Sequence, residues 1–250
     1  MPYGTYISAE GARVQSLQLE TISNNLANVN TTGFKRDLAR IQARHAEAIQ
    51  RGLDYAGSRS LNDIGGGVQV RDTVIDFSPG IYETTGRRLD FAVSGDGFFV
   101  VLKHEQEFLT RAGNFQFNSS GQLTTDQGDP VLSRRGVPIQ LNPTEPYEVT
   151  TKGQITQAGE VYELALVIPR SLADLTKAGG NLFSSQTNTE PVKSAQRQIL
   201  SGSLEKSSVN PISELTKMIE ASRAFEANIK LIQNQDDMLG SLINRVLATR

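Results

Sequence analysis

The end of the chain carries the pattern that most restricts its fold. Between residues 212 and 246, apolar side chains recur in steps of three and four, which predicts a helix with one apolar stripe. The stripe consists of Leu215, Met218, Phe225, Ile229, Ile232, Leu239, Ile243 and Val246, with Ser222 and Asp236 as its polar members. Asn210 is suited to the N-cap and Pro211 to the first turn. A helix of about 52 Å with one apolar stripe needs a partner helix.

The beginning of the chain supplies a candidate partner. Residues 8–30 contain no proline, and apolar residues follow helical spacing until Thr31, Thr32 and Gly33. We expect Gly33 to end this helix in the left-handed conformation. The stripe of this first helix consists of Ala12, Leu19, Ile22, Leu26 and Val29. The simplest way to bury both stripes is to pack the two helices against each other.

The middle of the chain has a different pattern. Turn clusters divide residues 88–168 into short segments rich in β-formers, as an antiparallel meander requires. Residues 37–50 are compatible with a short helix, whereas residues 52–67 and 178–194 resemble loops or linkers. The predicted fold class is therefore α+β: elongated, with paired N- and C-terminal helices forming a coiled-coil-like stalk and an inserted antiparallel β-rich domain. The alternative is an ordinary α+β globule with its helices on the sheet.

This organisation predicts five segments along the chain. They are an N-terminal stalk helix at 1–35, a connecting segment at 36–87, a β-rich domain at 88–195, a return linker at 196–209 and a C-terminal stalk helix at 210–250.

Composition narrows the classes of function. The chain has 25 basic and 27 acidic residues and no basic block, so nucleic-acid binding is not expected. It has no cysteine, which excludes disulfides, iron-sulfur clusters and thiolate zinc sites. The longest apolar runs, residues 98–102 and 164–168, are too short to cross a bilayer, so no membrane insertion is expected. The first residues show no cleavable secretory signal.

Candidate catalytic and ligand-binding motifs are weak. Ser94 lacks the first glycine of a nucleophile elbow, and residues 65–67, three glycines, precede a strand and are interpreted as a flexible hinge. The aspartate-containing turns do not have the spacing of a calcium loop. His45 and His104 lack the context of a catalytic triad, and we expect both to be solvated. We therefore assign no catalytic, metal or cofactor-binding residues and expect no cofactor.

An asparagine cluster is the unusual feature of the first helix. Asn24, Asn25, Asn28 and Asn30 fall in its last turns, where asparagine is a poor helix former. Side chains three and four residues apart share a helix face, so these amides can form a polar strip that fixes the register between packed helices. The alternative is a frayed helix end with capping amides.

At this segment the sequence resembles a known family. NNLANVNTTGFK, which ends at Lys35, is similar to the N-terminal signature of the bacterial flagellar rod and hook proteins. Residues 89–100 with 109–132 resemble the central β motif of that family, and residues 202–239 resemble its C-terminal helix. Length and the Val209-Asn210-Pro211 segment favour the proximal rod type, although the distal type also fits. Ser208 departs from the asparagine usual in the family, and residues 37–64 match nothing distinctive.

The resemblance implies a structural, non-enzymatic subunit of the flagellar basal-body rod, the periplasmic drive shaft that transmits torque from motor to hook. Expected partners are other rod and hook-basal-body proteins, further copies of the chain, and the flagellar type III export apparatus. The residues predicted to form assembly contacts are Leu19, Ile22, Asn24, Asn25, Leu26, Asn28, Val29, Gly33, Phe34, Leu215, Met218, Phe225, Ile229, Ile232, Leu239 and Ile243.

Two other classes of function remain as alternatives at this stage. One is a secreted coiled-coil adhesin or translocator-type surface protein, which needs a long exposed apolar or basic face. The other is a hydrolase that uses carboxylates such as Asp90 and Asp96, although no second carboxylate stands at a defined separation from either.

Overall fold

The computed structural model describes residues 3–45, 47–55, 57–58, 65–142, 145–150, 153–193 and 196–248. The chain divides into two compact units, and each is built from segments far apart in the sequence. The helical unit contains residues 1–27, 37–75 and 210–250, and the β-rich unit contains residues 28–36 and 76–209. No helix in the described part of the chain is both long enough and apolar enough to cross a membrane.

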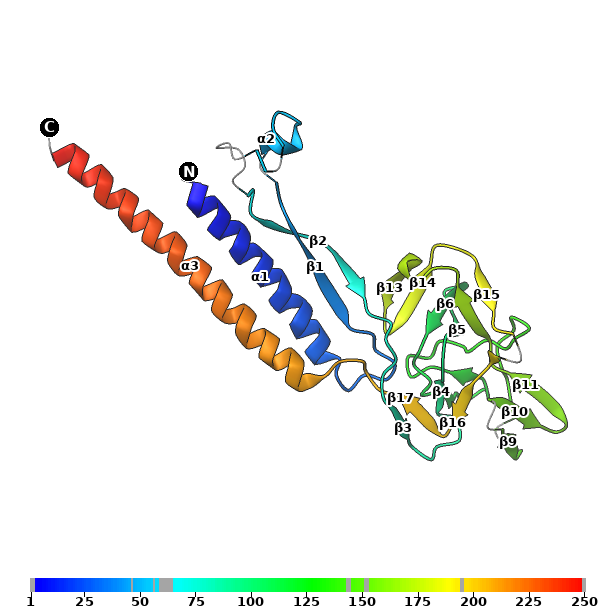
Figure 1. Ribbon diagram of the computed structural model, residues 1–250. Coiled ribbons are helices and arrows are strands. Elements are labelled where there is room, and N and C mark those ends of the chain that lie inside the picture. The colour runs from blue at the N-terminus through cyan, green and yellow to red at the C-terminus, as the bar shows by residue number, and fades with distance from the viewer. Residues whose placement is uncertain are drawn as a thin grey trace. The chain divides into compact units, whose positions relative to one another are not determined.

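The helical unit contains two long helices and a β-hairpin (Figure 1). Its elements are α1 (Tyr3–Ala27), β1 (Asp37–Ala43), α2 (Glu47–Gln50), β2 (Val68–Ile75) and α3 (Pro211–Ala248). The α3 helix begins as predicted, because the Asn210 side-chain oxygen accepts hydrogen bonds from the backbone N–H groups of Ile212 and Ser213 at 3.1 and 3.2 Å. The α1 and α3 helices lie side by side within this unit. A coiled-coil stalk made of the two helices stays a prediction.

The helix predicted over residues 37–50 is mostly wrong. Residues 37–43 form β1, which pairs antiparallel with β2, and only the four residues of α2 are helical. Leu38 lies opposite Val74, and Arg40 lies opposite Asp72 with an ion pair of 3.4 Å. The spacing of Leu38, Ile41 and Ile49 suits a helix. Residues 37–43 form a strand instead, because they pair with β2, which is rich in β-branched residues.

The hairpin connection was predicted as a loop over residues 52–67. The described part of it contains neither helix nor strand, while residues 56 and 59–64 lie outside the described residues. Gly66 does not lie in open space: its N–H donates to the Arg44 carbonyl at 2.7 Å, and a Cβ there would lie 2.5 Å from the His45 oxygen. Gly66 is therefore a position of close backbone approach, whereas a Cβ at Gly65 would meet nothing within 4 Å. His45 and His104 are exposed, as predicted.

The β-rich unit consists of short antiparallel strands. They are β3 (Tyr82–Thr84), β4 (Phe91–Val93), β5 (Phe98–Lys103), β6 (Gln106–Thr110), β7 (Gln116–Phe117), β8 (Leu123–Thr124), β9 (Tyr147–Val149), β10 (Gln154–Gln157), β11 (Glu160–Glu163), β12 (Leu166–Pro169), β13 (Leu175–Gly179), β14 (Leu182–Ser185), β15 (Thr189–Pro191), β16 (Ile199–Ser201) and β17 (Ser203–Glu205). A short 3-10 turn, η2 (Leu172–Asp174), precedes β13. The largest sheet has the order β13-β14-β6-β5-β12-β15.

This sheet order corrects the prediction in two ways. Residues 178–193 are not a loop, because β14 and β15 lie there; residue 194 lies outside the described residues. The strands follow a meander only locally, as in the β5–β6 hairpin, since β14 and β12 flank that hairpin from later in the chain. The described part of the fold is thus α+β, with an antiparallel β-rich middle as predicted.

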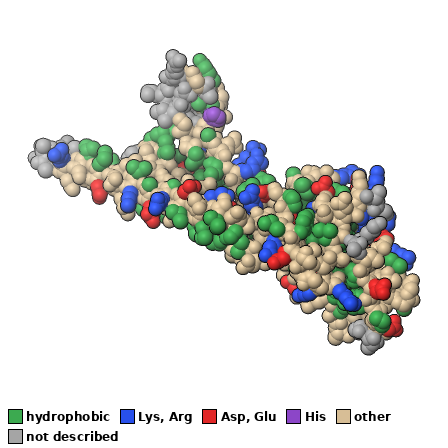
Figure 2. Space-filling model, turned by 60° about the horizontal axis from the view of Figure 1, so that its bottom comes forward, with side chains coloured by type: hydrophobic (Ala, Val, Ile, Leu, Met, Phe, Trp, Pro, Cys, Tyr) green, Lys and Arg blue, Asp and Glu red, His purple; other side chains and the backbone are tan. Residues whose placement is uncertain are grey.

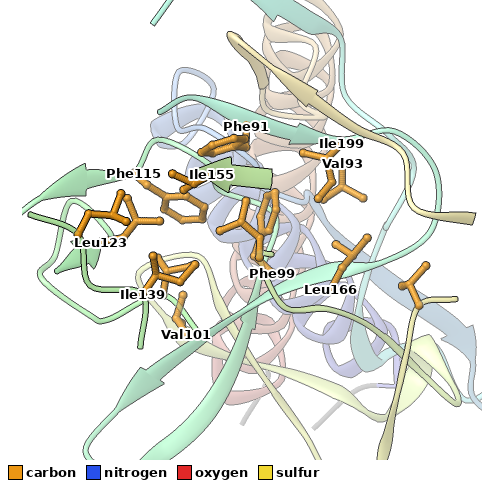
Figure 3. Packing of buried hydrophobic residues seen from close by; sticks show 14 of the residues in the cluster. Phe91, Val93, Phe99, Val101, Phe115, Leu123, Ile139, Ile155, Leu166 and Ile199 are labelled. Carbon is orange, nitrogen blue, oxygen red and sulfur yellow. The ribbon is translucent and has the colours of Figure 1, made fainter. Parts of the chain in front are cut away.

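The core of the β-rich unit contains a cluster of aromatic and aliphatic side chains (Figure 3). Phe99 is fully buried, and its ring meets that of Phe115 edge to face at 5.3 Å. Other members shown in Figure 3 are Phe91, Val93, Val101, Leu123, Ile139, Ile155, Leu166 and Ile199. Burial of this cluster supplies the main stabilisation of the unit.

Replacing Phe99 by alanine is expected to lower the free energy of unfolding of the β-rich unit by about 3–5 kcal/mol, because it removes buried surface and leaves a cavity. Denaturant unfolding followed by circular dichroism measures this change. Val161→Ala is the control, since Val161 is 54% exposed and its truncation should cost no more than about 0.5 kcal/mol. Equal losses in the two variants would contradict the assigned core.

Candidate assembly site

Glycine and polar side chains take part in the contact between α1 and α3. Gly4 lies against Gln235 and Gly11 lies against Asn228, where an added Cβ would come within 2.7 and 2.9 Å of the opposing side chain. Thr5 also donates a hydrogen bond of 2.6 Å to Gln235. Rising numbers on α1 therefore face falling numbers on α3, so the helices are antiparallel.

These contacts repeat every seven residues along both helices. The heptad positions that follow Gly4 and Gly11 are Gln18 and Asn25 on α1, and those that precede Asn228 are Ala221 and Glu214 on α3. The Asn25 amide reaches the Glu214 carboxylate at 3.5 Å, which continues the same register to the other end of α1. Small residues allow the backbones to approach closely, and polar pairs fix one register.

The apolar stripes are therefore only partly used within one chain. Of the predicted assembly residues on α1, Ile22 and Asn25 are buried, Leu19 and Leu26 are half-buried and Asn24 is exposed. Of those on α3, Met218, Phe225, Ile229 and Ile232 are half-buried, while Leu215, Leu239 and Ile243 are exposed. The two predicted stripes are thus not completely buried against each other within one chain, because glycine and polar side chains take part in the contact between the helices.

The C-terminal end of α3 extends beyond α1. Because Gly4 faces Gln235 and the described part of α1 begins at Tyr3, residues 237–248 of α3 have no described α1 residue opposite them. Leu239 and Leu242 follow Gln235 by four and seven positions, so they continue the face that covers α1. Leu242 and Ile243 are 59% and 58% exposed, and Figure 2 shows hydrophobic side chains at the surface near this end of the helix. We call Met238, Leu239, Leu242 and Ile243 the distal patch.

A second apolar patch lies at the other end of α3. Ile212, Leu215 and Ile219 are spaced by three and four residues, so they share one helix face, and all three are exposed. We call these three residues the proximal patch. About 26 residues separate the centres of the two patches, which is about 40 Å along the helix.

Asn25 is the one asparagine of the predicted polar strip that is fully buried. Its amide donates to the Asp37 carbonyl at 2.9 Å and accepts from the Asp37 N–H at 2.8 Å, so it holds the start of β1 against α1. Asn28 lies beyond α1 and accepts hydrogen bonds from Thr31, as a residue of a terminal turn does. The cluster thus divides into one packing residue and one turn residue. Asn30 is exposed.

A polar hollow of about 420 Å³ opens beside Asn25. Residues of α1, β1 and α3 line it, among them Gln18, Asp37, Glu214 and Glu220. Glu214 is almost fully buried, and Lys217 donates to its carboxylate at 2.8 Å. That ion pair satisfies the buried charge.

The predicted residues that follow α1 belong to the β-rich unit. The helix ends at Ala27, so Gly33 is not its C-terminal stop. Gly33 has a φ of +67°, and an added Cβ would lie 2.5 Å from the Ala112 nitrogen. Only glycine fits so close to another backbone in that conformation. Phe34 is buried with the Lys177 ammonium 4.2 Å from its ring centroid, while Val29 is half-buried.

Lys35 completes a buried charge cluster that sequence reasoning did not find. Its Nζ lies 2.6 Å from the Glu205 carboxylate and donates to the Ser78 carbonyl at 2.8 Å. Arg111 approaches the other Glu205 oxygen at 3.4 Å, and all three side chains are buried. Burial lowers the pKa of Lys35, and the nearby Glu205 carboxylate offsets this only in part. We call Lys35, Glu205 and Arg111 the charge cluster.

No local signal marked this cluster. Lys35 stands in the N-terminal signature and Glu205 in the C-terminal matching stretch, but 170 residues separate them. A lysine directly after an aromatic residue, Phe34, at the end of the signature was the one local feature that could have indicated a buried charge.

A second ion pair lies next to the charge cluster. The Arg36 guanidinium lies 2.7 Å from the Asp76 carboxylate, and Ser78 donates to the same carboxylate through its hydroxyl and its backbone N–H. Desolvation alone would raise the pKa of Asp76, but the hydrogen bonds from Ser78 and Arg36 outweigh it and lower that pKa to about 2.

Comparison with known proteins assigns the family. Three protein-family profiles match in chain order: "Flagella basal body rod protein" at residues 6–35, "Flagellar hook protein FlgE/F/G D1 domain" at 92–163 and "Flagellar basal body rod FlgEFG protein C-terminal" at 200–245. Flagellar basal-body rod protein FlgF of Caulobacter vibrioides is 34% identical, with 98% of each chain covered. The chain belongs to the flagellar basal-body rod family.

Further rod-family relatives cover the chain to a similar extent. Flagellar basal-body rod protein FlgG of Borreliella burgdorferi is 33% identical over 94% of this chain and 95% of its own. FlgG of Bacillus subtilis is 31% identical over 96% and 97%. The three family profiles together match both helices at the ends of the chain and part of the β-rich middle.

Replacing Asn25 by alanine is expected to cost the helical unit about 2 kcal/mol, because the backbone N–H and C=O of Asp37 lose their side-chain partner beside a buried site. Thermal unfolding followed at a helical circular-dichroism wavelength measures the loss. Asn24→Ala is the matched control because Asn24 is exposed. If Asn24→Ala lowers the stability of the helical unit as much as Asn25→Ala does, the packing role assigned to Asn25 is wrong.

The stability of the β-rich unit is expected to fall between about pH 4 and pH 2. Asp76 has a folded-state pKa of about 2 and an ordinary value of 3.8, so its charge contributes up to about 2 kcal/mol above this window and loses that contribution as the pH falls through it. Urea unfolding at pH 5 and pH 2.5 measures the difference. Asp76→Asn should show a smaller difference, and an unchanged one would assign the acid sensitivity to other groups.

Proposed function

We propose that this protein is a structural subunit of the flagellar rod and that its helical unit holds it to neighbouring subunits. Membership of the rod family supports the structural role. The assembly site is supported by the different use of two sets of residues on α3. Polar residues such as Gln235 and Asn228 contact glycines of α1, while the distal and proximal patches stay exposed.

The energetic argument favours burial of these patches in an assembly. Moving a fully exposed leucine or isoleucine side chain into a packed interface is worth about 1.5–3 kcal/mol. Ile212 is 77% exposed and Met238 is 66% exposed, so each patch has most of this free energy still available. Contiguous apolar surface of this kind marks sites of protein–protein contact.

The positions of the patches favour an open assembly. They lie at opposite ends of α3, so a contact between the distal patch of one copy and the proximal patch of the next is heterologous. Heterologous contacts that do not close on themselves produce a helical assembly rather than a ring. Other rod and hook-basal-body proteins with related helices are further candidate neighbours.

The predicted assembly residues thus fall into two proposed groups. Contacts between subunits are proposed for Leu215, Leu239 and Ile243 and for the exposed edges of Met218, Phe225, Ile229 and Ile232. A role in the folding of the single subunit is proposed for Leu19, Ile22, Asn25, Leu26, Asn28, Val29, Gly33 and Phe34, and a contact between subunits is proposed for the exposed Asn24.

The finer features of this function are part of the same proposal. The subunit transmits torque along the rod as a non-enzymatic part, and it leaves the cell interior through the flagellar type III export apparatus without a cleaved signal. The absence of cysteine suits a chain that is exported unfolded. The adhesin or translocator alternative has no support, since the relatives are named as basal-body rod proteins.

Replacing Ile243 by aspartate is expected to abolish swimming, because a carboxylate would be buried in the contact made by the distal patch. The source bacterium carrying the variant in place of its own gene is tested in soft agar, and isolated basal bodies are inspected for rods. The purified variant should unfold at the wild-type temperature, since Ile243 is 58% exposed in the single chain.

Asn244→Asp is the matched control, because Asn244 is also exposed on α3 but lies at least 100° around the helix from each residue of the distal patch at about 100° per residue. Loss of swimming in Ile243→Asp with normal swimming in the control supports the distal patch as a contact. Normal swimming in both variants would reject that patch, and normal swimming after deletion of the gene would reject the structural role itself.

A further inference from the structure

Three segments meet in the β-rich unit where the main chain enters or leaves that unit. They are residues 33–36, 76–81 and 205–208, and each lies within a few residues of a boundary of the unit. Backbone hydrogen bonds join the first to the third, from the Gly33 N–H to the Glu205 carbonyl at 2.7 Å and from the Ser208 N–H to the Phe34 carbonyl at 3.0 Å. We call these the three junction segments.

The second junction segment is joined to both of the others. The Asp76 N–H donates to the Arg36 carbonyl and the Lys206 N–H donates to the Ile81 carbonyl, each at 2.9 Å. Gly80 allows this approach, since an added Cβ would lie only 2.0 Å from the Lys206 oxygen. The three segments therefore form one closely packed set of backbones.

The charge cluster fastens this set from inside. One Glu205 carboxylate oxygen accepts from Lys35 of the first segment and from the Gly80 N–H of the second at 2.9 Å. The Lys35 ammonium also donates to the Ser78 carbonyl, while Arg111 meets the other carboxylate oxygen. Lys35 is 1% exposed and Glu205 is 0% exposed, so water does not screen these interactions.

We propose that the charge cluster is a mechanical clamp that holds the three junction segments together as one body when the subunit is under load. This inference rests on the proposed rod function, because only a subunit that transmits torque is pulled at the points where its chain leaves the β-rich unit. Such a clamp is a device for stiffness, distinct from the contacts between subunits.

The clamp depends on the free energy that is needed to move one junction segment away from the other two. Moving the first or the third junction segment away separates a buried charge from its partner, and moving the second removes a hydrogen bond from the buried Lys35 ammonium and another from the Glu205 carboxylate. Buried charges that lose their partners are strongly unfavourable. The Glu205 carboxylate is shared by two segments and by Arg111, so the segments are expected to open together rather than one at a time. A surface ion pair cannot do this, because water replaces the lost partner.

Hydrogen exchange of the purified full-length protein tests the coupling. Lys35→Met removes the ammonium and leaves Glu205 with Arg111. Exchange is expected to rise about tenfold or more at amides in all three junction segments, including Gly33, Gly80 and Ser208. A rise confined to residues 33–36 would overturn the clamp. Glu205→Asp, which keeps the charge but shortens the side chain, should give a smaller rise over the same three segments if the first variant does not fold.

Arg170→Met is the control for the loss of a cation. Arg170 lies 3.2 Å from Glu190, but both side chains are about two-thirds exposed. Its removal is expected to leave exchange at the junction segments unchanged. A rise there equal to that caused by Lys35→Met would show that the effect is not specific to the buried cluster, and would overturn the proposal.

Swimming under load tests the mechanical role. Cells carrying Lys35→Met are expected to assemble rods and to swim in ordinary medium, but to shed hooks with filaments several-fold more often in viscous medium than cells carrying Arg170→Met. Equal shedding by the two strains would reject the clamp while leaving the rod function in place. Swimming by a strain from which the gene is deleted would instead reject the rod function, and the exchange result would then stand as a property of the fold alone.

Discussion

The carboxylate of Glu205 is fully buried, and the arrangement around it depends on how that charge is neutralised. Arg111 comes from within the β-rich segment, but Lys35 comes from the segment that follows the first helix. The β-rich unit therefore requires a short piece from near the start of the chain to complete its own interior. That requirement explains why residues 28–36 belong to this unit although they directly continue the sequence of α1.

In the helical unit, glycine and uncharged polar side chains, rather than buried ion pairs, fix the register between α1 and α3. If large apolar residues made the closest contact between α1 and α3, one chain could bury most of its apolar surface alone. Gly4 and Gly11 against Gln235 and Asn228 give a close, register-specific contact that consumes little apolar surface. Most of the leucine, isoleucine and methionine side chains on the outer faces of α3 stay exposed in the single chain, and this is the surface that we propose neighbouring subunits cover.

Sequence patterns identified the elements whose signals are local. The start of α3 at Asn210 followed from its capping residue, and the antiparallel β-rich middle followed from clusters of turn residues. The β1 strand was misassigned because its partner lies on the far side of a long connection, and the charge cluster was missed because Lys35 and Glu205 are 170 residues apart. The apolar stripe predicted that the two helices pair, but glycine layers such as that at Gly11 become visible only when the opposing residue is known.

Both units share a topological property that bears on how such a subunit is made. The helical unit needs α1 together with α3, and the β-rich unit needs residues 33–36 together with residues 205–208. A chain that emerges from its N-terminus can complete neither unit until its last fifth has appeared. Closing contacts across so many residues is also entropically costly and slow. The same long-range pairings therefore keep the growing chain open, which is consistent with the proposed export of an unfolded chain.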